Sequence, residues 1–286
     1  MIKSLLLKNW KSFESAQLWV DQLTFIIGTN AAGKSNIVDA LSFLANTATG
    51  CRLSDSVSLI RGGVEGLIKR DEDSATLNIV LIVGKEEFNY GISLELEGKE
   101  LLIKEEKLVV TNHAGREKIL YSTDEAEEGS NQIVARFQKD KAGPRKGLPV
   151  KRDFSVLSQI PNLNVIKDIK EKAELVSNSL KSIFVLDPKP EKMRHYTPLA
   201  DKLASDGSNI AGVIAGLPDD KKKEFEKKLT DYVRPLPERD LKKIWAEPIG
   251  RFSYAKLEIF SICTTFMPYK FILLLTLFSI FVFPGH

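Results

Sequence analysis

One loop constrains this chain more than any other stretch of its sequence. Residues 28–35 read Gly-Thr-Asn-Ala-Ala-Gly-Lys-Ser, after the apolar run Leu23–Ile27 and before an amphipathic run from Asn36 to Leu44. A strand, a glycine-rich loop with Lys-Ser and a helix form the arrangement that wraps backbone N–H groups around nucleotide phosphates. The sequence therefore predicts a phosphate-binding loop here rather than an ordinary glycine turn with an exposed lysine.

The residue types in the predicted loop have separate physical roles. Gly28 and Gly33 permit backbone angles and close approaches that a Cβ atom would obstruct. The N–H groups from Asn30 to Ser35 are expected to point inward at a helix N-terminus, where they bind anions. Lys34 would place its ammonium between the β- and γ-phosphates, and the Ser35 hydroxyl would complete a Mg²⁺ shell.

The first part of the chain is β-rich. Its apolar density and alternation predict strands over residues 2–7, 18–27, 75–83, 87–96 and 101–110. The last three are separated by the short turns Gly84-Lys85 and Glu97-Gly98-Lys99. Short turns between alternating strands indicate an antiparallel meander.

Helical patterns occur directly after the loop and again later in the chain. The first helix is expected to bury Ile37, Leu41 and Leu44, with Asp39 and Asn46 facing away. From Asp153 to about Trp245 the sequence is again mainly helical, and its clearest helix opens at Pro218-Asp219-Asp220.

Three segments and one fold class follow from these patterns. Residues 1–153 are expected to form a nucleotide-binding lobe with a β-meander, residues 154–250 a mainly helical middle region, and residues 251–286 an apolar tail. The predicted class is α/β, in its α+β form, because an antiparallel meander and helices share one domain.

The apolar tail differs in composition from the rest of the chain. Residues 251–286 hold seven of the fifteen phenylalanines. The uninterrupted apolar run, 271–283, is shorter than the ~20 residues that a membrane-spanning helix needs. Pro268 and Lys270 interrupt its extension upstream. A non-native continuation is therefore favoured over a C-terminal membrane anchor.

Charge and cysteine content exclude few partners. The formal net charge is +3, and the two cysteines, Cys51 and Cys263, are too few for a disulfide framework. The N-terminus lacks the long apolar region of a signal peptide, so the cytoplasm is the expected location. The acidic run 122–130 and the basic run 139–152 are expected to be solvated loops. The alternative for the basic run is contact with a phosphate backbone, which leaves DNA open as a partner.

Absent motifs and a family resemblance together indicate which class of phosphate-binding protein this chain belongs to. No guanine-reading Asn-Lys-x-Asp occurs, and a meander directly after the first helix fits a small-metabolite kinase badly. The stretch Lys3–Phe13, with Leu-Lys-Asn-Trp-Lys-Ser-Phe, and the loop Gly28-x-Asn30-x-x-Gly33-Lys34-Ser35-Asn36 resemble the RecF/SMC-type ATPases. These are ABC-type P-loop proteins that are often called AAA family ATPases.

The resemblance covers about residues 1–252. It includes a middle region with Leu186-Asp187-Pro188, Met193-Arg194 and Asp206-Gly207-Ser208-Asn209. It implies an ABC-type ATPase head that binds ATP and Mg²⁺ and dimerises across two nucleotides, in DNA repair, chromosome maintenance or defence against foreign DNA. The ATP-binding residues that it implies are Gly28, Thr29, Asn30, Ala31, Ala32, Gly33, Lys34, Ser35 and Asn36, with Ser35 on the metal. By position it also places Lys11 and Ser12 near the nucleotide, where the alternative is an exposed turn.

Hydrolysis in this family needs two further motifs. One is an apolar strand that ends in Asp-Glu, and the other is a signature loop that caps the partner's ATP. Ile183–Asp187 has the apolar run, but Pro188 follows it where Glu is required. Leu53–Ser56 and Ser205–Ser208 imitate the signature loop at the wrong places in the chain.

A truncated or frame-disrupted ATPase head is the hypothesis that accounts for these gaps. The expected function is ATP binding, with hydrolysis absent or very slow. The alternatives are a non-hydrolysing regulatory or partner subunit and a membrane-tethered ATP-binding protein. A homodimer or a second protein is the expected partner.

Overall fold

The computed structural model describes residues 1–286 except 59, 128, 140–144, 234–240, 250–253 and 262–286. The chain forms two compact units, Met1–Phe184 and Val185–His286. The helices between residues 156 and 181 thus belong to the first unit, although the sequence grouped them with the middle region, 154–250. Each unit is described by itself.

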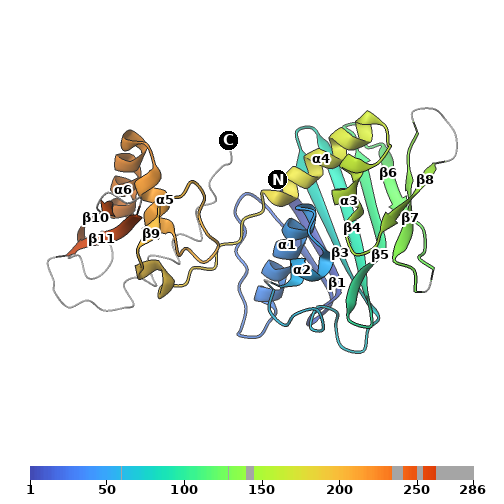
Figure 1. Cartoon of the computed structure of the whole chain (residues 1–286), viewed down its shortest axis with the longest axis horizontal. Coiled ribbons are helices and arrows are strands. Elements are labelled where there is room, and N and C mark those ends of the chain that lie inside the picture. The colour runs from blue at the N-terminus through green and yellow to red at the C-terminus, as the bar shows by residue number, and fades with distance from the viewer. Residues whose placement is uncertain (59, 128, 140–144, 234–240, 250–253, 262–286) are drawn as a thin grey trace. The chain divides into compact units, whose positions relative to one another are not determined.

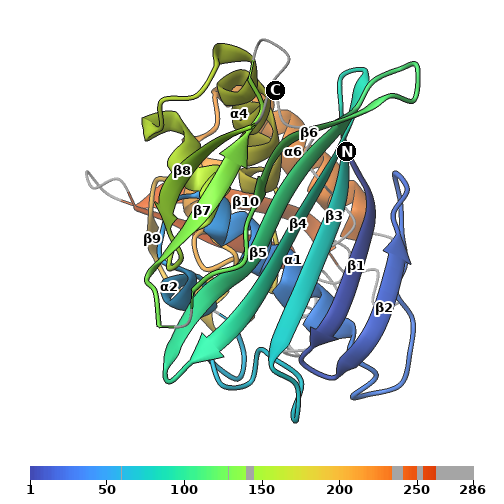
Figure 2. The same cartoon turned by 90° about the vertical axis from the view of Figure 1, so that its right-hand side faces the viewer.

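The first unit contains an eight-stranded sheet with the order β2-β1-β3-β4-β5-β6-β7-β8 (Figure 2). The strands are β1 (Ile2–Trp10), β2 (Phe13–Trp19), β3 (Ser74–Val83), β4 (Glu86–Glu97), β5 (Glu100–Thr111), β6 (Glu117–Thr123), β7 (Gln132–Phe137) and β8 (Lys146–Lys151). All neighbours pair antiparallel. The predicted meander is confirmed, and its turns require Gly84 and Gly98, whose φ angles are 61° and 63°.

Helices cover one face of this sheet (Figure 1). They are α1 (Lys34–Ala48), α2 (Leu53–Val57), α3 (Val156–Gln159) and α4 (Lys167–Lys181), with a short 3₁₀ turn, η1 (Ile160–Asn162). Alternate residues of β3 (Ala75, Leu77, Ile79 and Leu81) point into the core between the sheet and these helices. Phe43 and Leu44 of α1 and Val176 of α4 meet them there. The α/β class with an antiparallel sheet is therefore confirmed.

The basic run 139–152 is not a loop throughout. Residues 146–151 form β8, the strand at one edge of the sheet. Pro149 lacks a backbone N–H, and an edge strand tolerates it because only one side of such a strand must donate to a neighbour. The prediction of a solvated loop is therefore wrong over residues 146–151, because pairing with β7 accommodates both Gly147 and Pro149.

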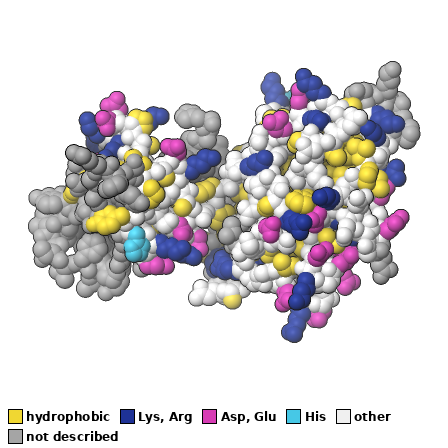
Figure 3. Space-filling model, in the orientation of Figure 1, with side chains coloured by type: hydrophobic (Ala, Val, Ile, Leu, Met, Phe, Trp, Pro, Cys, Tyr) yellow, Lys and Arg dark blue, Asp and Glu magenta, His cyan; other side chains and the backbone are white. Residues whose placement is uncertain are grey.

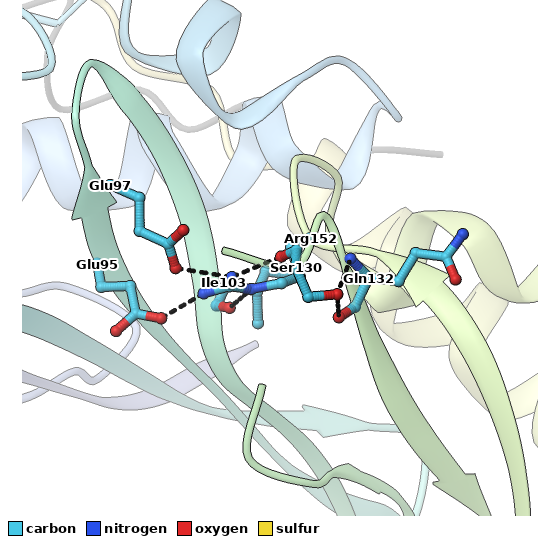
Figure 4. A network of polar contacts seen from close by, with 6 residues as sticks. All are labelled: Glu95, Glu97, Ile103, Ser130, Gln132 and Arg152. Carbon is cyan, nitrogen blue, oxygen red and sulfur yellow. Dashed lines mark hydrogen bonds and ion pairs between the residues drawn. The ribbon is translucent and has the colours of Figure 1, made fainter. Parts of the chain in front are cut away.

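Arg152 directly follows β8 and is fully buried. Its guanidinium contacts Glu95, Glu97 (2.8 Å) and the carbonyl oxygens of Ser130 (2.8 Å) and Ile103 (3.0 Å) (Figure 4). A buried charge is tolerated only when it is paired and hydrogen-bonded. Arg152 therefore joins the end of β8 to β4 and β5, and its charge is not available to an external phosphate.

A second buried charge, Glu106 on β5, joins the sheet to α3. Its carboxylate accepts hydrogen bonds from the Tyr121 hydroxyl (2.7 Å), the Val156 N–H (2.8 Å) and the Leu157 N–H (2.9 Å). The hydroxyls of Tyr90 and Ser155 lie at 3.2 Å. Burial raises the pKa of Glu106, and the hydrogen bonds partly oppose that rise. The side chain thus satisfies two N–H groups at the start of α3 that a helix leaves without partners.

We predict that Glu106→Ala lowers the free energy of unfolding of the chain by about 3 kcal/mol, because buried donors lose their acceptor. Urea unfolding followed by circular dichroism measures the change. Glu105→Ala is the matched control, since Glu105 is the exposed neighbour on the same strand. An equal loss in both variants would contradict the role assigned to Glu106.

The second unit contains both helices and strands. It contains a 3₁₀ turn, η2 (Lys192–Arg194), the helices α5 (Ile210–Gly216) and α6 (Asp219–Val233), and the strands β9 (Thr197–Pro198), β10 (Leu241–Ile249) and β11 (Tyr254–Ser261). The strands pair antiparallel in the order β10-β11-β9. Glu226 and Thr230 of α6 accept the N–H groups of Ala246 and Ile244, which lie on the edge strand β10. The helix thereby covers a sheet edge that would otherwise be free.

Two sequence predictions concern the end of the chain: the apolar tail, 251–286, and the alternative of a membrane anchor. β11 lies within the predicted tail, 251–286, and pairs with β10 along its whole length. Within the part of the chain that the structure describes, no helix combines the length and the apolar character needed to cross a membrane. The run 271–283, on which the membrane-anchor alternative depends, lies outside the described residues.

Candidate nucleotide-binding site

The loop Gly28–Ser35 leads into α1, as the sequence predicts. α1 begins at Lys34, and Gly33 precedes it with φ at 89° in the left-handed region. The Gly33 carbonyl accepts the N–H groups of Asn36 (2.8 Å) and Ile37 (3.3 Å). Ala31 also has a positive φ, 65°. The glycine at position 33 allows the chain to turn sharply from the loop into the helix.

A second constraint on Gly33 comes from the β1–β2 turn. A Cβ atom at position 33 would lie 2.6 Å from the Phe13 ring and 3.3 Å from the Ser12 hydroxyl. The Asn36 amide donates to Ser12 Oγ (2.8 Å), and Trp10 Nε1 donates to the Asn36 carbonyl (2.8 Å). The start of α1 is therefore held against the turn between β1 and β2. Of the residues predicted at the site, Ser12 and Asn36 are brought together here.

Lys34 and Ser35 lie at the first turn of α1. Lys34 Nζ donates to the carbonyl oxygens of Gly28 (2.6 Å) and Thr29 (2.7 Å), which closes the loop on itself. The Ser35 side chain and residues 28–32 are exposed. The loop therefore presents its backbone and the Ser35 hydroxyl to solvent at a helix N-terminus, which is a favourable place for an anion.

Lys11 has a partner of its own. Its ammonium lies 2.6 Å from Asp39 Oδ2 and 2.6 Å from the carbonyl oxygen of Arg61. The side chains of Lys11 and Asp39 are only 7% and 9% exposed. The expectation that Asp39 faces away from the core is wrong, because a buried lysine from the β1–β2 turn requires its carboxylate. The placement of Lys11 near a nucleotide stays a prediction.

Arg61 is a residue near α1 that the sequence did not single out. Its guanidinium lies 3.9 Å from Asp39 Oδ1, and its side chain is 68% exposed. It precedes Gly62 and Gly63, which both have positive φ angles. The Arg-Gly-Gly pattern was the available signal, but a sequence does not reveal that this loop returns to α1.

The predicted strand before the loop is absent from the structure. β2 ends at Trp19, and residues 20–33 form neither helix nor strand. The prediction of a strand over 18–27 is therefore wrong after Trp19. A strand needs a neighbour to bond its backbone, and no neighbour pairs with Leu23–Ile27 within the described residues.

Comparison with known proteins agrees with the fold. Residues 1–273 match the family model of the AAA ATPase domain. The chain belongs to this family. It is similar to the mouse Structural maintenance of chromosomes protein 1B, at 37% identity over 84 residues, which are 28% of this chain and 7% of that protein.

A second relative of this AAA ATPase domain is the DNA replication and repair protein RecF of Bacillus mycoides. It is 34% identical over 84 residues, which are 27% of this chain and 22% of RecF. The chain thus matches less than a quarter of the length of either relative. The resemblance to RecF/SMC-type ATPases is confirmed, and ATP binding is a property of the family.

The structure shows the local environment of the three stretches that resemble catalytic motifs in this AAA ATPase domain. Residues 183–187 form no strand. Asp206 starts a turn before α5, where its carboxylate accepts the Ser208 N–H (3.1 Å) and contacts Lys192. Hydrogen bonds from Ser208 and Lys192 lower the pKa of Asp206 to about 2. Leu53 begins α2. The interpretation of all three as imitations stays a prediction.

We predict that Lys11→Met lowers the free energy of unfolding by about 3 kcal/mol, because it leaves the buried Asp39 carboxylate without its cation. The double variant with Asp39→Leu should recover most of that loss. Lys8→Met, on the exposed side of β1, is the control. Weaker ATP binding by Lys11→Met without any loss of stability would instead favour contact of Lys11 with the nucleotide.

Proposed function

We propose that Gly28–Ser35 binds the phosphates of Mg²⁺·ATP and that this chain is an ATP-binding ATPase head of the RecF/SMC-like group. The observation that carries the proposal is the exposed loop, held at the N-terminus of α1 by the packing of Gly33 against Phe13. A larger residue at position 33 would disturb this arrangement. The loop fits a triphosphate because its exposed N–H groups and Lys34 supply positive charge at one point.

Each residue would contribute separately to binding. Lys34 would exchange the carbonyl oxygens of Gly28 and Thr29 for β- and γ-phosphate oxygens, which are stronger acceptors because they are charged. The N–H groups from Asn30 to Ser35 would donate to the phosphates, and the Ser35 hydroxyl would bind Mg²⁺. When bound, Mg²⁺ would neutralise part of the phosphate charge. Asn36 would hold the loop in place through its hydrogen bond to Ser12. Residues 28–35 would make the contacts with the nucleotide.

We also propose that hydrolysis by this chain alone is absent or very slow. Water attack on the γ-phosphate needs a residue that orients or deprotonates the water. Within α1 the one acidic residue is Asp39, and its carboxylate is already paired with Lys11 and Arg61. This favours ATP as a ligand whose cleavage depends on groups supplied from elsewhere.

A role linked to DNA follows only from the printed names of the two relatives, which refer to chromosomes and to DNA replication and repair. The basic run gives it little support. Arg152 is buried, Lys146 donates to the Asn164 carbonyl and Arg145 donates to Ser122. On the face shown in Figure 3, acidic and basic side chains are interspersed. We therefore keep ATP binding as the single proposed function.

We predict that Lys34→Ala weakens the binding of a fluorescent ATP analogue at least tenfold in the presence of Mg²⁺, because a charged hydrogen-bond donor to the phosphates is lost. A titration of analogue fluorescence measures the dissociation constant. Lys8→Ala, which removes an exposed lysine from β1, should change it less than twofold.

Equal affinity in the wild type and Lys34→Ala would contradict the proposed site. Release of phosphate by the wild-type chain in the same buffer tests the second part of the proposal. Turnover that disappears in Lys34→Ala would show that the chain cleaves ATP without outside help.

A further inference from the structure

A pocket of about 280 Å³ opens at one end of the sheet in the first unit. It lies where β5 and β7 begin and β8 ends, beside the residue that precedes α2. Its described lining residues include none of the Gly28–Ser35 loop. Sites for small molecules typically begin at about 300 Å³, so this pocket has room for a ligand of amino-acid size. We refer to it as the strand-end pocket.

The backbone around the strand-end pocket is firmly held. The Arg152 N–H donates to the carbonyl oxygen of Asn131 (3.1 Å), and the Arg152 carbonyl accepts the Ile103 N–H (2.9 Å). The Gln159 side chain accepts the Lys151 N–H (3.0 Å) and donates to the Lys151 carbonyl (2.9 Å). The walls of the pocket are therefore fixed before any ligand arrives, which lowers the entropic cost of binding.

Charged side chains of both signs line the strand-end pocket. Arg52 and Asp153 lie 3.5 Å apart and pair with each other. Among the described residues, the other two charged groups, Lys151 and Glu100, form no ion pair and no side-chain hydrogen bond. The Lys151 ammonium lies 5.8 Å from the centre of the Phe154 ring, a weak contact for an exposed cation. The pocket therefore holds one cation and one anion that do not neutralise each other.

Uncharged side chains complete the lining. Asn131 and Gln132 contribute two amides, each of which can both donate and accept hydrogen bonds. Within the part of the chain that the structure describes, neither amide has a hydrogen-bond partner. Figure 4 shows the Gln132 amide extending away from Arg152. Leu102, which is only 2% exposed, supplies an apolar surface.

We propose that the strand-end pocket binds a small zwitterion with an aliphatic body, such as an amino acid. Its carboxylate would pair with Lys151, its ammonium with Glu100, and its body would lie over Leu102. A simple anion would be repelled by Glu100 and Asp153, and a simple cation by Lys151 and Arg52, whereas a zwitterion complements both signs. The two lining amides would bond to its polar ends. This proposal does not depend on ATP binding at the Gly28–Ser35 loop.

Isothermal titration calorimetry of the full chain with L-leucine, 4-aminobutyrate and 6-aminohexanoate tests the proposal. These three zwitterions differ in the separation of their two charges, so the series also distinguishes an α-amino acid from an ω-amino acid. We expect saturable binding of at least one of them, with a dissociation constant below about 1 mM. For the zwitterion that binds most tightly, the analogues that lack either the amine or the carboxylate should bind at least about tenfold more weakly, because each loses a charged hydrogen bond.

Substitutions locate the binding and separate it from the nucleotide site. Lys151→Met and Glu100→Gln should each weaken zwitterion binding by at least about tenfold. Both side chains are exposed, and circular dichroism verifies that each variant is folded. Lys104→Met and Glu105→Gln are the matched controls, because these residues of β5 are exposed and lie outside the lining. Lys34→Ala should leave the zwitterion affinity unchanged, so failure of the proposed ATP site would not affect this result.

Three results would overturn the proposal of a zwitterion site. One is the absence of saturable binding by all three zwitterions up to about 10 mM, a concentration that would reveal even weak sites. Another is equal affinity for the analogues that carry a single charge. The third is an affinity that neither Lys151→Met nor Glu100→Gln changes, since binding would then take place elsewhere on the chain.

Discussion

The structure depends on the contact between the β1–β2 turn and the start of α1. Phe13 packs against Gly33, and Trp10 and Ser12 bond the backbone and side chain of Asn36. Lys11, from the same turn, pairs with Asp39 one turn farther along the helix. Four consecutive residues of a hairpin thus fix the beginning of a helix, and the glycine-rich loop must fit into the space that remains.

This contact explains how the loop is held although Leu23–Ile27 forms no strand before it. In a complete parallel sheet, the strand would fix one end of the loop and the helix the other. Here the helix is fixed by the antiparallel sheet through β1 and β2, while Leu23–Ile27 is exposed. Half of the support for a nucleotide site is therefore present in the described residues.

The sequence predicted the meander and the loop-to-helix junction well because both depend on local chemistry. Gly84 and Gly98 mark two-residue turns, and Gly33 marks a helix start. The prediction of a strand before the loop was wrong because a strand forms only beside a neighbouring strand, and hydrophobic periodicity does not show whether such a neighbour exists. The roles of Asp39 and Arg152 were missed for a related reason. A charged residue is expected at the surface unless a distant partner, such as Lys11 or Glu97, is known to reach it.

Leu23–Ile27 has no sheet partner among the described residues of this chain. Amide hydrogen exchange of the purified chain, resolved by residue, tests it most directly because exchange reports whether each N–H is bonded. We expect the amides of Phe25, Ile26 and Ile27 to exchange at nearly the rate of an unfolded peptide, while those of Leu77 and Ile79 in β3 are strongly protected. Protection of residues 25–27 equal to that of β3 would contradict it.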